Sequence, residues 1–180
     1  GTSADGKSSV LQAGVIPQLQ HERKTAVLYF RHWQTEDYLT RLKAAARAAI
    51  EQAEGKPLTI DDTLPFDRWI EQALEQFRGQ LHVLLDQFEE YLLYHADPGP
   101  TSFDAELAAA INRRNVGARF LIALRDDGLA KLDRFRRRVP NLLGNTLRLQ
   151  RLSVSAAHEA IEGPLRVYNE QLPDGQKVTI

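Results

Sequence analysis

The first eight residues of the chain, GTSADGKS, match the pattern G-x-x-x-x-G-K-[ST] at every fixed position. Gly1 and Gly6 allow backbone angles that would strain a side chain, so consecutive N–H groups can point toward phosphate oxygens. The helix that begins near Lys7 adds the partial positive charge of its N-terminus. Lys7 is placed to reach β- and γ-phosphates, and the Ser8 hydroxyl to bind Mg²⁺. The pattern therefore predicts a phosphate-binding loop, and the alternative is a glycine-containing turn that caps a helix.

We expect the nucleotide-binding residues to extend from this loop into the first turn of the helix, because both present backbone N–H groups to an anion. The candidates are Gly1, Thr2, Ser3, Ala4, Asp5, Gly6, Lys7, Ser8 and Ser9. Ser8 is in addition a candidate metal ligand.

Downstream of the loop, short apolar runs rich in strand formers alternate with segments of helical periodicity. The predicted strands are Ala26–His32, Leu81–Leu85, Ala118–Leu124 and Thr146–Leu152. The predicted helices are Asp37–Ala53, Phe66–Phe77, Ser102 to about Arg114, Leu129–Arg137, and a last helix from Ser153 or Ser155 that stops at Gly163-Pro164. This alternation is typical of an α/β protein, so we expect a parallel sheet with helices on both faces. A loop of this type follows a strand, so we also expect the first strand of the sheet to be missing before Gly1.

An acidic segment follows the apolar run Leu81–Leu85. Asp86 comes directly after this run, at the position where a carboxylate at a strand's carboxyl end holds the water shell of Mg²⁺. Glu89 and Glu90 follow within one turn, and either is a candidate general base for the attacking water. The alternative for the two glutamates is a solvated acidic helix start, which the helix macrodipole favours. The residues do not decide between Glu89 and Glu90.

An arginine follows the most apolar of the predicted strands. Arg125 leaves the carboxyl end of Ala118–Leu124, where ligands bind in open parallel sheets. Its guanidinium suits bidentate contact with phosphate oxygens, so we expect it to sense a γ-phosphate. The alternative is a surface ion pair with Asp126 or Asp127.

The bulk composition argues against several classes of function. A formal net charge of −1 over 180 residues implies no general attraction to nucleic acid or membranes. No run approaches the roughly 18 apolar residues of a membrane-spanning helix. The chain has no cysteine, its histidines lack metal-ligand spacing, and the basic run from Arg134 to Arg138 is typical of a solvated helix face. We therefore expect a cytoplasmic protein without a membrane or nucleic-acid partner.

Four blocks of the sequence resemble, in order and spacing, the bacterial STAND NTPases, in particular the branch usually called novel STAND. They are GKSSVLQAGVIPQL (residues 6–19), LLDQFEEYLLYH (84–95), FLIALRDDGLAKL (120–132) and LSVSAAHEAIEGPL (152–165). The resemblance covers nearly the whole chain. It implies a P-loop NTPase fold of the ASCE type with strand order 5-1-4-3-2, and ATP as the nucleotide.

The resemblance also implies roles for individual residues. Lys7 and Ser8 look like the Walker A pair and Asp86 like the Walker B aspartate. Glu89 or Glu90 would be the acidic hydrolytic residue, and Arg125 the sensor arginine. By the same resemblance, residues 1–165 form the NTPase core, and residues 166–180 form a linker or the beginning of the lid region.

The main functional expectation is an ATP-binding, slowly hydrolysing switch module of a multidomain signalling ATPase. The resemblance implies an effector domain and WD40 or TPR repeats in the same full-length chain, with self-association through the NTPase module. Because the chain lacks methionine, including at position 1, we expect it to be a piece of a longer polypeptide. Two alternatives stay open: an AAA+-like ATPase acting mechanically on nucleic acid, and a non-catalytic nucleotide-binding module.

Overall fold

The computed structural model describes residues 6–95, 102–113, 117–149 and 153–170. One compact unit spans Lys7–Thr146, and the described residues of a second unit are Gly6, 147–149 and 153–170. The first unit contains, in chain order, α1 (Lys7–Ser9), η1 (Val10–Val15), α2 (Ile16–Gln20), β1 (Thr25–Phe30), α3 (Tyr38–Glu54), α4 (Phe66–Phe77), β2 (Gln80–Leu85), α5 (Phe88–Tyr94), α6 (Phe103–Asn112), β3 (Ala118–Ile122) and η2 (Asp126–Phe135). The second unit contains α7 (Val154–Glu170).

The three strands form a parallel sheet in the order β1-β2-β3. In this register Phe30 lies opposite Leu85, and Leu85 opposite Ile122. Parallel strands end on the same side, so the residues that follow β1, β2 and β3 meet at one edge of the sheet. The strands predicted at residues 26–32, 81–85 and 118–124 are confirmed, with slightly different ends.

The fourth predicted strand, Thr146–Leu152, does not form over its described residues. Residues 146–149 are not strand, and Leu147 is 84% exposed; residues 150–152 lie outside the described part of the chain. The alternating pattern predicted one face of a strand, but a strand also needs a neighbouring backbone to pair with. Among the described residues, none pairs with this segment as a strand.

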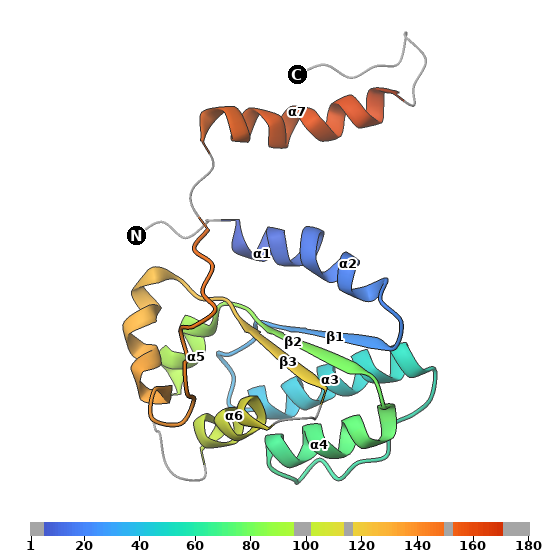
Figure 1. Cartoon of the computed structure of the whole chain (residues 1–180), viewed down its shortest axis with the longest axis vertical. Coiled ribbons are helices and arrows are strands. Elements are labelled where there is room, and N and C mark those ends of the chain that lie inside the picture. Colours follow the sequence, from blue (N-terminus) through green and yellow to red (C-terminus); the bar gives the residue numbers. More distant parts are fainter. Residues whose placement is uncertain (1–5, 96–101, 114–116, 150–152, 171–180) are drawn as a thin grey trace. The chain divides into compact units, whose positions relative to one another are not determined.

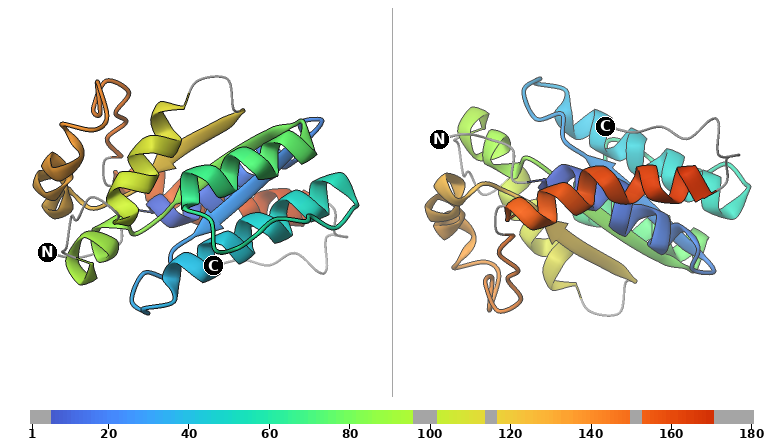
Figure 2. Two further views of the ribbon diagram at one scale, coloured as in Figure 1. Left: turned by 90° about the horizontal axis from the view of Figure 1, so that it is seen from below. Right: turned by 90° about the horizontal axis from the view of Figure 1, so that it is seen from above.

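Helices cover both faces of the sheet, as expected. The continuous helical segment α1-η1-α2 lies over one face, whereas α3, α4 and α6 lie over the other (Figures 1 and 2). The predicted helices 37–53, 66–77 and 102–114 correspond to α3, α4 and α6. The segment predicted at 129–137 is a 3-10 helix, η2, which begins earlier, at Asp126.

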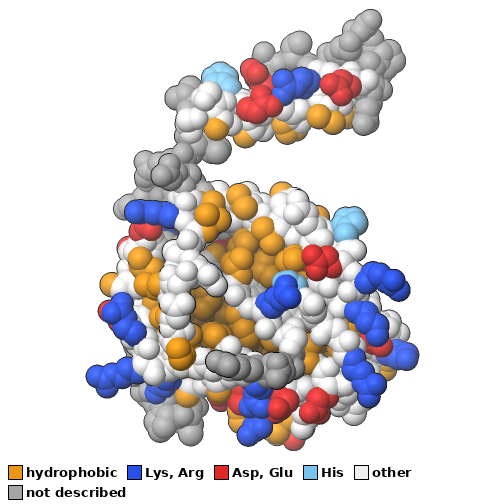
Figure 3. All heavy atoms as spheres, in the orientation of Figure 1, with side chains coloured by type: hydrophobic (Ala, Val, Ile, Leu, Met, Phe, Trp, Pro, Cys, Tyr) orange, Lys and Arg blue, Asp and Glu red, His pale blue; other side chains and the backbone are white. Residues whose placement is uncertain are grey.

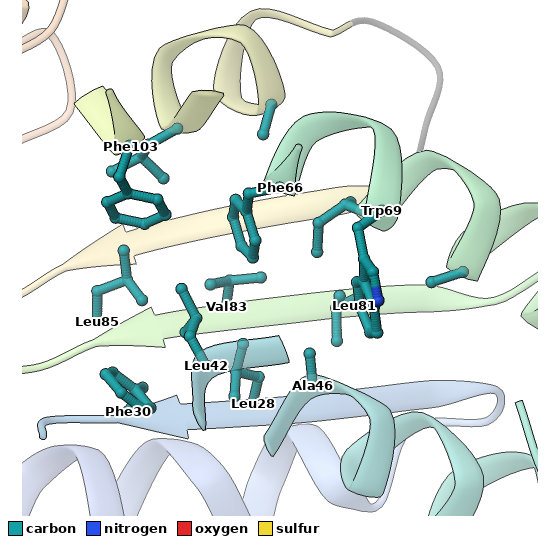
Figure 4. Close-up of a cluster of buried hydrophobic side chains, with 14 of the residues drawn as sticks. Leu28, Phe30, Leu42, Ala46, Phe66, Trp69, Leu81, Val83, Leu85 and Phe103 are labelled. Atoms are coloured by element: carbon teal, nitrogen blue, oxygen red, sulfur yellow. The ribbon is translucent and has the colours of Figure 1, made fainter. Parts of the chain in front are cut away.

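The hydrophobic core lies between the sheet and the layer of α3, α4 and α6. Alternate side chains of the strands point into it, which is the period-2 pattern of a strand with one face toward the core. Figure 4 shows the buried side chains that meet there: Leu28 and Phe30 of β1, Leu81, Val83 and Leu85 of β2, Leu42 and Ala46 of α3, Phe66 and Trp69 of α4, and Phe103 of α6. Each large side chain buried in this way stabilises the fold by about 1.5–3 kcal/mol. The core therefore fixes where the carboxyl ends of the strands lie.

The outer strand β3 is less covered than its neighbours. Its paired residues among those described are all on β2, and Leu121 is 40% exposed on the face opposite the core. The space-filling view shows hydrophobic side chains gathered in a hollow on this side of the molecule (Figure 3). The sheet therefore presents apolar surface beside its β3 edge.

Helix α7 continues past the point where the sequence predicted its end. Gly163 does not have the left-handed backbone of a helix stop, and the helix runs through Pro164 to Glu170. An interior proline costs a helix about 3 kcal/mol but does not forbid it. Arg166 contacts the Glu159 carboxylate across the proline, which ties the two turns together. Within the described ranges, no helix is long and apolar enough to cross a membrane.

Candidate functional site

The first contact of the candidate site joins two residues that are 78 positions apart in the sequence. The Ser8 Oγ donates a hydrogen bond of 2.5 Å to Asp86 Oδ2. Ser8 lies in α1, at the start of the helix that covers one face of the sheet, and Asp86 follows the last residue of β2. The fold thus brings together the hydroxyl and the carboxylate that the sequence predicted as metal ligands.

Asp86 is buried, with 1% of its surface exposed, and each of its polar groups has a partner. Oδ2 also accepts from the Tyr29 hydroxyl at 2.7 Å, and Oδ1 accepts from the Gln87 backbone N–H at 2.9 Å. The Asp86 N–H donates to the Phe30 carbonyl, and its carbonyl accepts from Trp33 Nε1 at 2.7 Å. A buried carboxylate with this many donors is held in one orientation.

Tyr29 and Gln12 extend this hydrogen-bonded group. The Gln12 side-chain amide donates to the Tyr29 hydroxyl oxygen at 2.8 Å. Burial and the hydrogen bond to Asp86 together raise the pKa of Tyr29, because both disfavour the phenolate. At neutral pH the Tyr29 hydroxyl therefore keeps the proton that it donates to Asp86.

A sharp turn after Asp86 directs the chain into α5. Gln87 has a left-handed backbone, with φ 52°, and its carbonyl accepts from the Glu90 N–H at 2.9 Å. Phe88 is fully buried, and its N–H donates to the Ala123 carbonyl beyond the end of β3. The turn and this anchor place Glu89 and Glu90 in the first turn of α5, beside the end of β3.

The second contact of the site joins Glu89 to Arg125. Glu89 Oε2 accepts from the Arg125 backbone N–H at 3.2 Å, and Oε1 lies 3.4 Å from Arg125 Nε. Gly128 permits this approach, since a Cβ at that position would lie 2.8 Å from the Glu89 Cβ. The Glu89 side chain is 12% exposed and that of Arg125 is 39% exposed.

Arg125 and Glu90 each have a further partner. Arg125 Nη2 lies 3.1 Å from Asp127 Oδ2, which is one of the two surface pairs considered from the sequence. Glu90 Oε2 accepts from the Gln34 amide at 3.3 Å, so it turns toward the segment after β1. The two glutamates therefore have different environments: Glu89 pairs with a cation and Glu90 with a neutral amide.

Buried polar contacts hold the two segments that carry Glu89 and Arg125. Arg134 of η2 pairs with Asp104 of α6, with 2.8 Å between Nε and Oδ2, and the Tyr91 hydroxyl of α5 donates to the same carboxylate at 2.5 Å. Burial and, to a smaller extent, this hydrogen bond raise the pKa of Tyr91. The expectation of a solvated face is thus wrong for Arg134, whose side chain is 17% exposed, because an isolated basic run does not reveal a distant buried carboxylate.

The remaining predicted residues of the loop divide into two groups. Lys7 and Ser9 lie in α1 next to Ser8, and Gly6 has a positive φ of 68°, a conformation suited to glycine. The other predicted loop residues, Gly1, Thr2, Ser3, Ala4 and Asp5, lie outside the described part of the chain.

Sequence reasoning missed Tyr29, Gln12 and Gln34. The alternation in the β1 run contains a signal for Tyr29, because Leu28 and Phe30 point into the core and the residue between them must point to the opposite face. No comparable signal marks Gln12 or Gln34, whose partners lie in distant segments.

The oxygen donors at this edge fit Mg²⁺. In the described ranges, no group of three or more His, Cys, Asp or Glu residues is arranged to hold a metal ion. Mg²⁺ does not need such a cage, because it is usually bound through one or two protein oxygens together with waters and substrate phosphates. Ser8 Oγ and Asp86, in contact at 2.5 Å, supply oxygens of this kind.

The chain matches a known protein family. The model of a family described as Novel STAND NTPase 1 matches residues 1–179. Comparison with curated proteins and with solved structures found no match. The match spans both the Ser8–Asp86 contact and the Glu89–Arg125 contact, in an α/β chain with a parallel sheet. This chain belongs to the Novel STAND NTPase 1 family.

Proposed function

We propose that this domain binds ATP·Mg²⁺ and hydrolyses ATP slowly, as the switch module of a multidomain STAND-type signalling ATPase. The observation that carries the proposal is the 2.5 Å contact between Ser8 Oγ and Asp86 Oδ2. It joins the first turn of the helix after the glycine-containing loop to the carboxyl end of a buried parallel strand. That is the juxtaposition that a phosphate-bound Mg²⁺ requires of its protein ligands.

The strand order supports a P-loop fold of the ASCE type. The observed order β1-β2-β3 agrees with strands 2, 3 and 4 of the order 5-1-4-3-2. In that order strand 4 has a further neighbour, strand 1, on its other side. Among the described residues β3 pairs with β2 alone, so the other edge of β3 is where such a neighbour would pair.

In this proposal the loop and the first turn of its helix bind the phosphates, and two side chains hold the metal ion. The backbone N–H groups of residues 1–9 would bind the phosphates, and Lys7 would place its charge against the β- and γ-phosphates. Ser8 and Asp86 would hold Mg²⁺, which when bound neutralises charge on the phosphate oxygens. The three hydrogen bonds to the Asp86 carboxylate keep that side chain oriented.

Hydrolysis requires a base, and signalling requires a response to the γ-phosphate. We assign the base to Glu89 or Glu90 and the response to Arg125. Arg125 pairs with Glu89 and Asp127, and a γ-phosphate offers it a competing anionic partner of matching geometry. A change of partner by Arg125 would alter the interactions of Glu89 and thereby link nucleotide state to α5.

The expected output is a shift between two populations of the whole protein. ATP·Mg²⁺ would favour an open, self-associating state and ADP a closed one. The effector domain and the WD40 or TPR repeats of the full-length chain would read this difference. We place the protein in the cytoplasm and give it no membrane or nucleic-acid partner.

The test is calorimetric titration of ATP·Mg²⁺ into the full-length protein and its Lys7→Ala variant. The variant loses the charge opposite the β- and γ-phosphates, so its affinity should fall about 100-fold or more. Lys56→Ala, which removes an exposed lysine in the loop after α3, is the matched control and should bind as the wild type does. Wild-type affinity in Lys7→Ala would overturn the assignment of the loop.

A further inference from the structure

The hydroxyl group of Tyr29 lies between two other elements of the fold. It accepts from the Gln12 amide at 2.8 Å and donates to Asp86 Oδ2 at 2.7 Å. Gln12 belongs to η1, on the helical segment that starts at Lys7, whereas Tyr29 belongs to β1. The three side chains form a relay from the helix after the loop, through β1, to the carboxylate at the end of β2.

The chemistry of the three groups fixes the direction of the relay. A phenol has a single proton, and an ionised carboxylate is a stronger acceptor than an amide carbonyl. The Tyr29 proton therefore points to Asp86, and its oxygen is left to accept the N–H of Gln12. The hydrogen bond from Gln12 therefore holds the Tyr29 O–H in the orientation in which it donates to Asp86.

We propose that Tyr29 is a positioning residue for the metal-linked part of the nucleotide site, and that Gln12 orients its proton. This inference rests on the function proposed above. Asp86 Oδ2 accepts two O–H groups, one from Ser8 and one from Tyr29, which restricts the rotation of the carboxylate. Restricted rotation aims the remaining acceptor positions of Asp86 in a fixed direction, as partners of metal-linked carboxylates commonly do.

The Tyr29 hydroxyl can be removed without disturbing the contacts that hold the backbone of Asp86. The backbone of Asp86 is held independently, by the Phe30 carbonyl and by Trp33 Nε1. Tyr29→Phe keeps the ring and the strand and removes only the hydroxyl. It should therefore remove one of the three hydrogen bonds to the Asp86 carboxylate, and so loosen it, without moving the end of β2.

The experiment measures ATP binding to the full-length protein by calorimetry at increasing Mg²⁺, and again with the metal removed by EDTA. In Tyr29→Phe the Mg²⁺ concentration needed for half of the tightening of ATP binding should rise about tenfold, as is typical when a partner of a ligating side chain is lost. ATP binding in EDTA should not change. Tyr94→Phe removes a hydroxyl from a tyrosine of α5 that is 53% exposed, and as the control it should behave as the wild type.

A second variant, at Gln12, changes the direction in which the Tyr29 hydroxyl donates its proton. Gln12 is exposed, so Gln12→Glu should fold normally. The new carboxylate replaces a donor with an acceptor and draws the Tyr29 proton away from Asp86. This variant should raise the Mg²⁺ requirement as Tyr29→Phe does, and combining the two should add little.

The outcomes separate the relay from the function on which it rests. A wild-type protein without Mg²⁺-dependent ATP binding would overturn both proposals. Normal Mg²⁺ dependence in Tyr29→Phe beside a responsive wild type would overturn the relay alone. A loss of ATP affinity in EDTA equal to that in Mg²⁺ would show that Tyr29 has a merely structural role, and would also overturn it.

Discussion

The two halves of the candidate site are held in different ways. The Ser8–Asp86 half has a carboxylate that is 1% exposed, with donors from Ser8, Tyr29 and the Gln87 backbone. In the Glu89–Arg125 half, the arginine side chain is 39% exposed and is shared between Glu89 and Asp127. The first half has its hydrogen bonds satisfied inside the protein, and the second has two carboxylates that share one partly exposed guanidinium.

This difference indicates a division of labour. A buried carboxylate with all its hydrogen bonds formed is costly to move, because each buried donor that loses it as a partner costs about 1–3 kcal/mol in desolvation. A surface ion pair is worth about 1 kcal/mol or less, so that an arriving phosphate can replace it. We expect the Ser8–Asp86 half, called here the fixed half, to keep its contacts through the proposed nucleotide cycle. We expect the Glu89–Arg125 half, called the changeable half, to exchange partners.

The largest effect is expected from the glutamates of the changeable half. The double variant Glu89→Gln/Glu90→Gln should retain ATP binding while hydrolysis falls by about 10²–10⁴, because a general base contributes that much. Slow hydrolysis traps a switch in its ATP state, so the full-length protein should oligomerise more with ATP. Light scattering measures the oligomer, and phosphate release measures turnover.

The same double variant also tests the mechanical alternative. A motor needs repeated turnover, so a monomeric and inactive double variant would argue for that alternative and against the switch. Unchanged hydrolysis would instead favour a non-catalytic module. The single variants then identify the base: Glu89 pairs with Arg125 and Glu90 with Gln34, so only one of them should reproduce the loss.

A smaller but still large effect is expected from the fixed half. Asp86→Asn keeps the shape of the side chain and removes its charge. The Mg²⁺ concentration needed for half of the tightening of ATP binding should therefore rise about 100-fold. Binding without metal should change much less. Asp133→Asn, at a side chain that is 67% exposed, is the matched control. Equal losses with Mg²⁺ and with EDTA would show that Asp86 supports the fold rather than the metal.

The next effect in size concerns Arg125. Arg125→Ala would remove the proposed charge-assisted contact with the γ-phosphate, so the preference for ATP over ADP should fall about tenfold. ATP-dependent oligomerisation should fall with it. Arg125→Lys retains the charge without the planar fork and should recover only part of the preference. A protein that prefers ATP equally well without Arg125 would remove this residue from the switch.

The sequence located residues at helix starts and strand ends better than it located contacts between distant segments, for physical reasons. Ser8 and Asp86 each sit at a position that local patterns specify, the start of a helix after a glycine-containing loop and the end of an apolar strand. The partners of Glu90 and Arg134 come from distant segments, Gln34 and Asp104, and no local pattern encodes those pairings. The same limit applies to the strand predicted at Thr146, because periodicity describes one strand and not the neighbour that it needs.

The smallest effect is expected from Asp127, and it tests the comparison most directly. Asp127 is 70% exposed and contacts Arg125 through Nη2, whereas Glu89 contacts it through Nε. Asp127→Asn removes a surface pair worth about 0.5 kcal/mol, so Arg125 should become available to the γ-phosphate about twofold more readily. The preference for ATP over ADP should therefore rise about twofold at low salt, and the difference from the wild type should shrink near 1 M salt, where the Debye length is about 3 Å. Asp133→Asn, again exposed but paired with Arg136, should show no such change. If Asp127→Asn lowered the preference for ATP, Asp127 would hold Arg125 in its working position, and the second half of the site would be as fixed as the first.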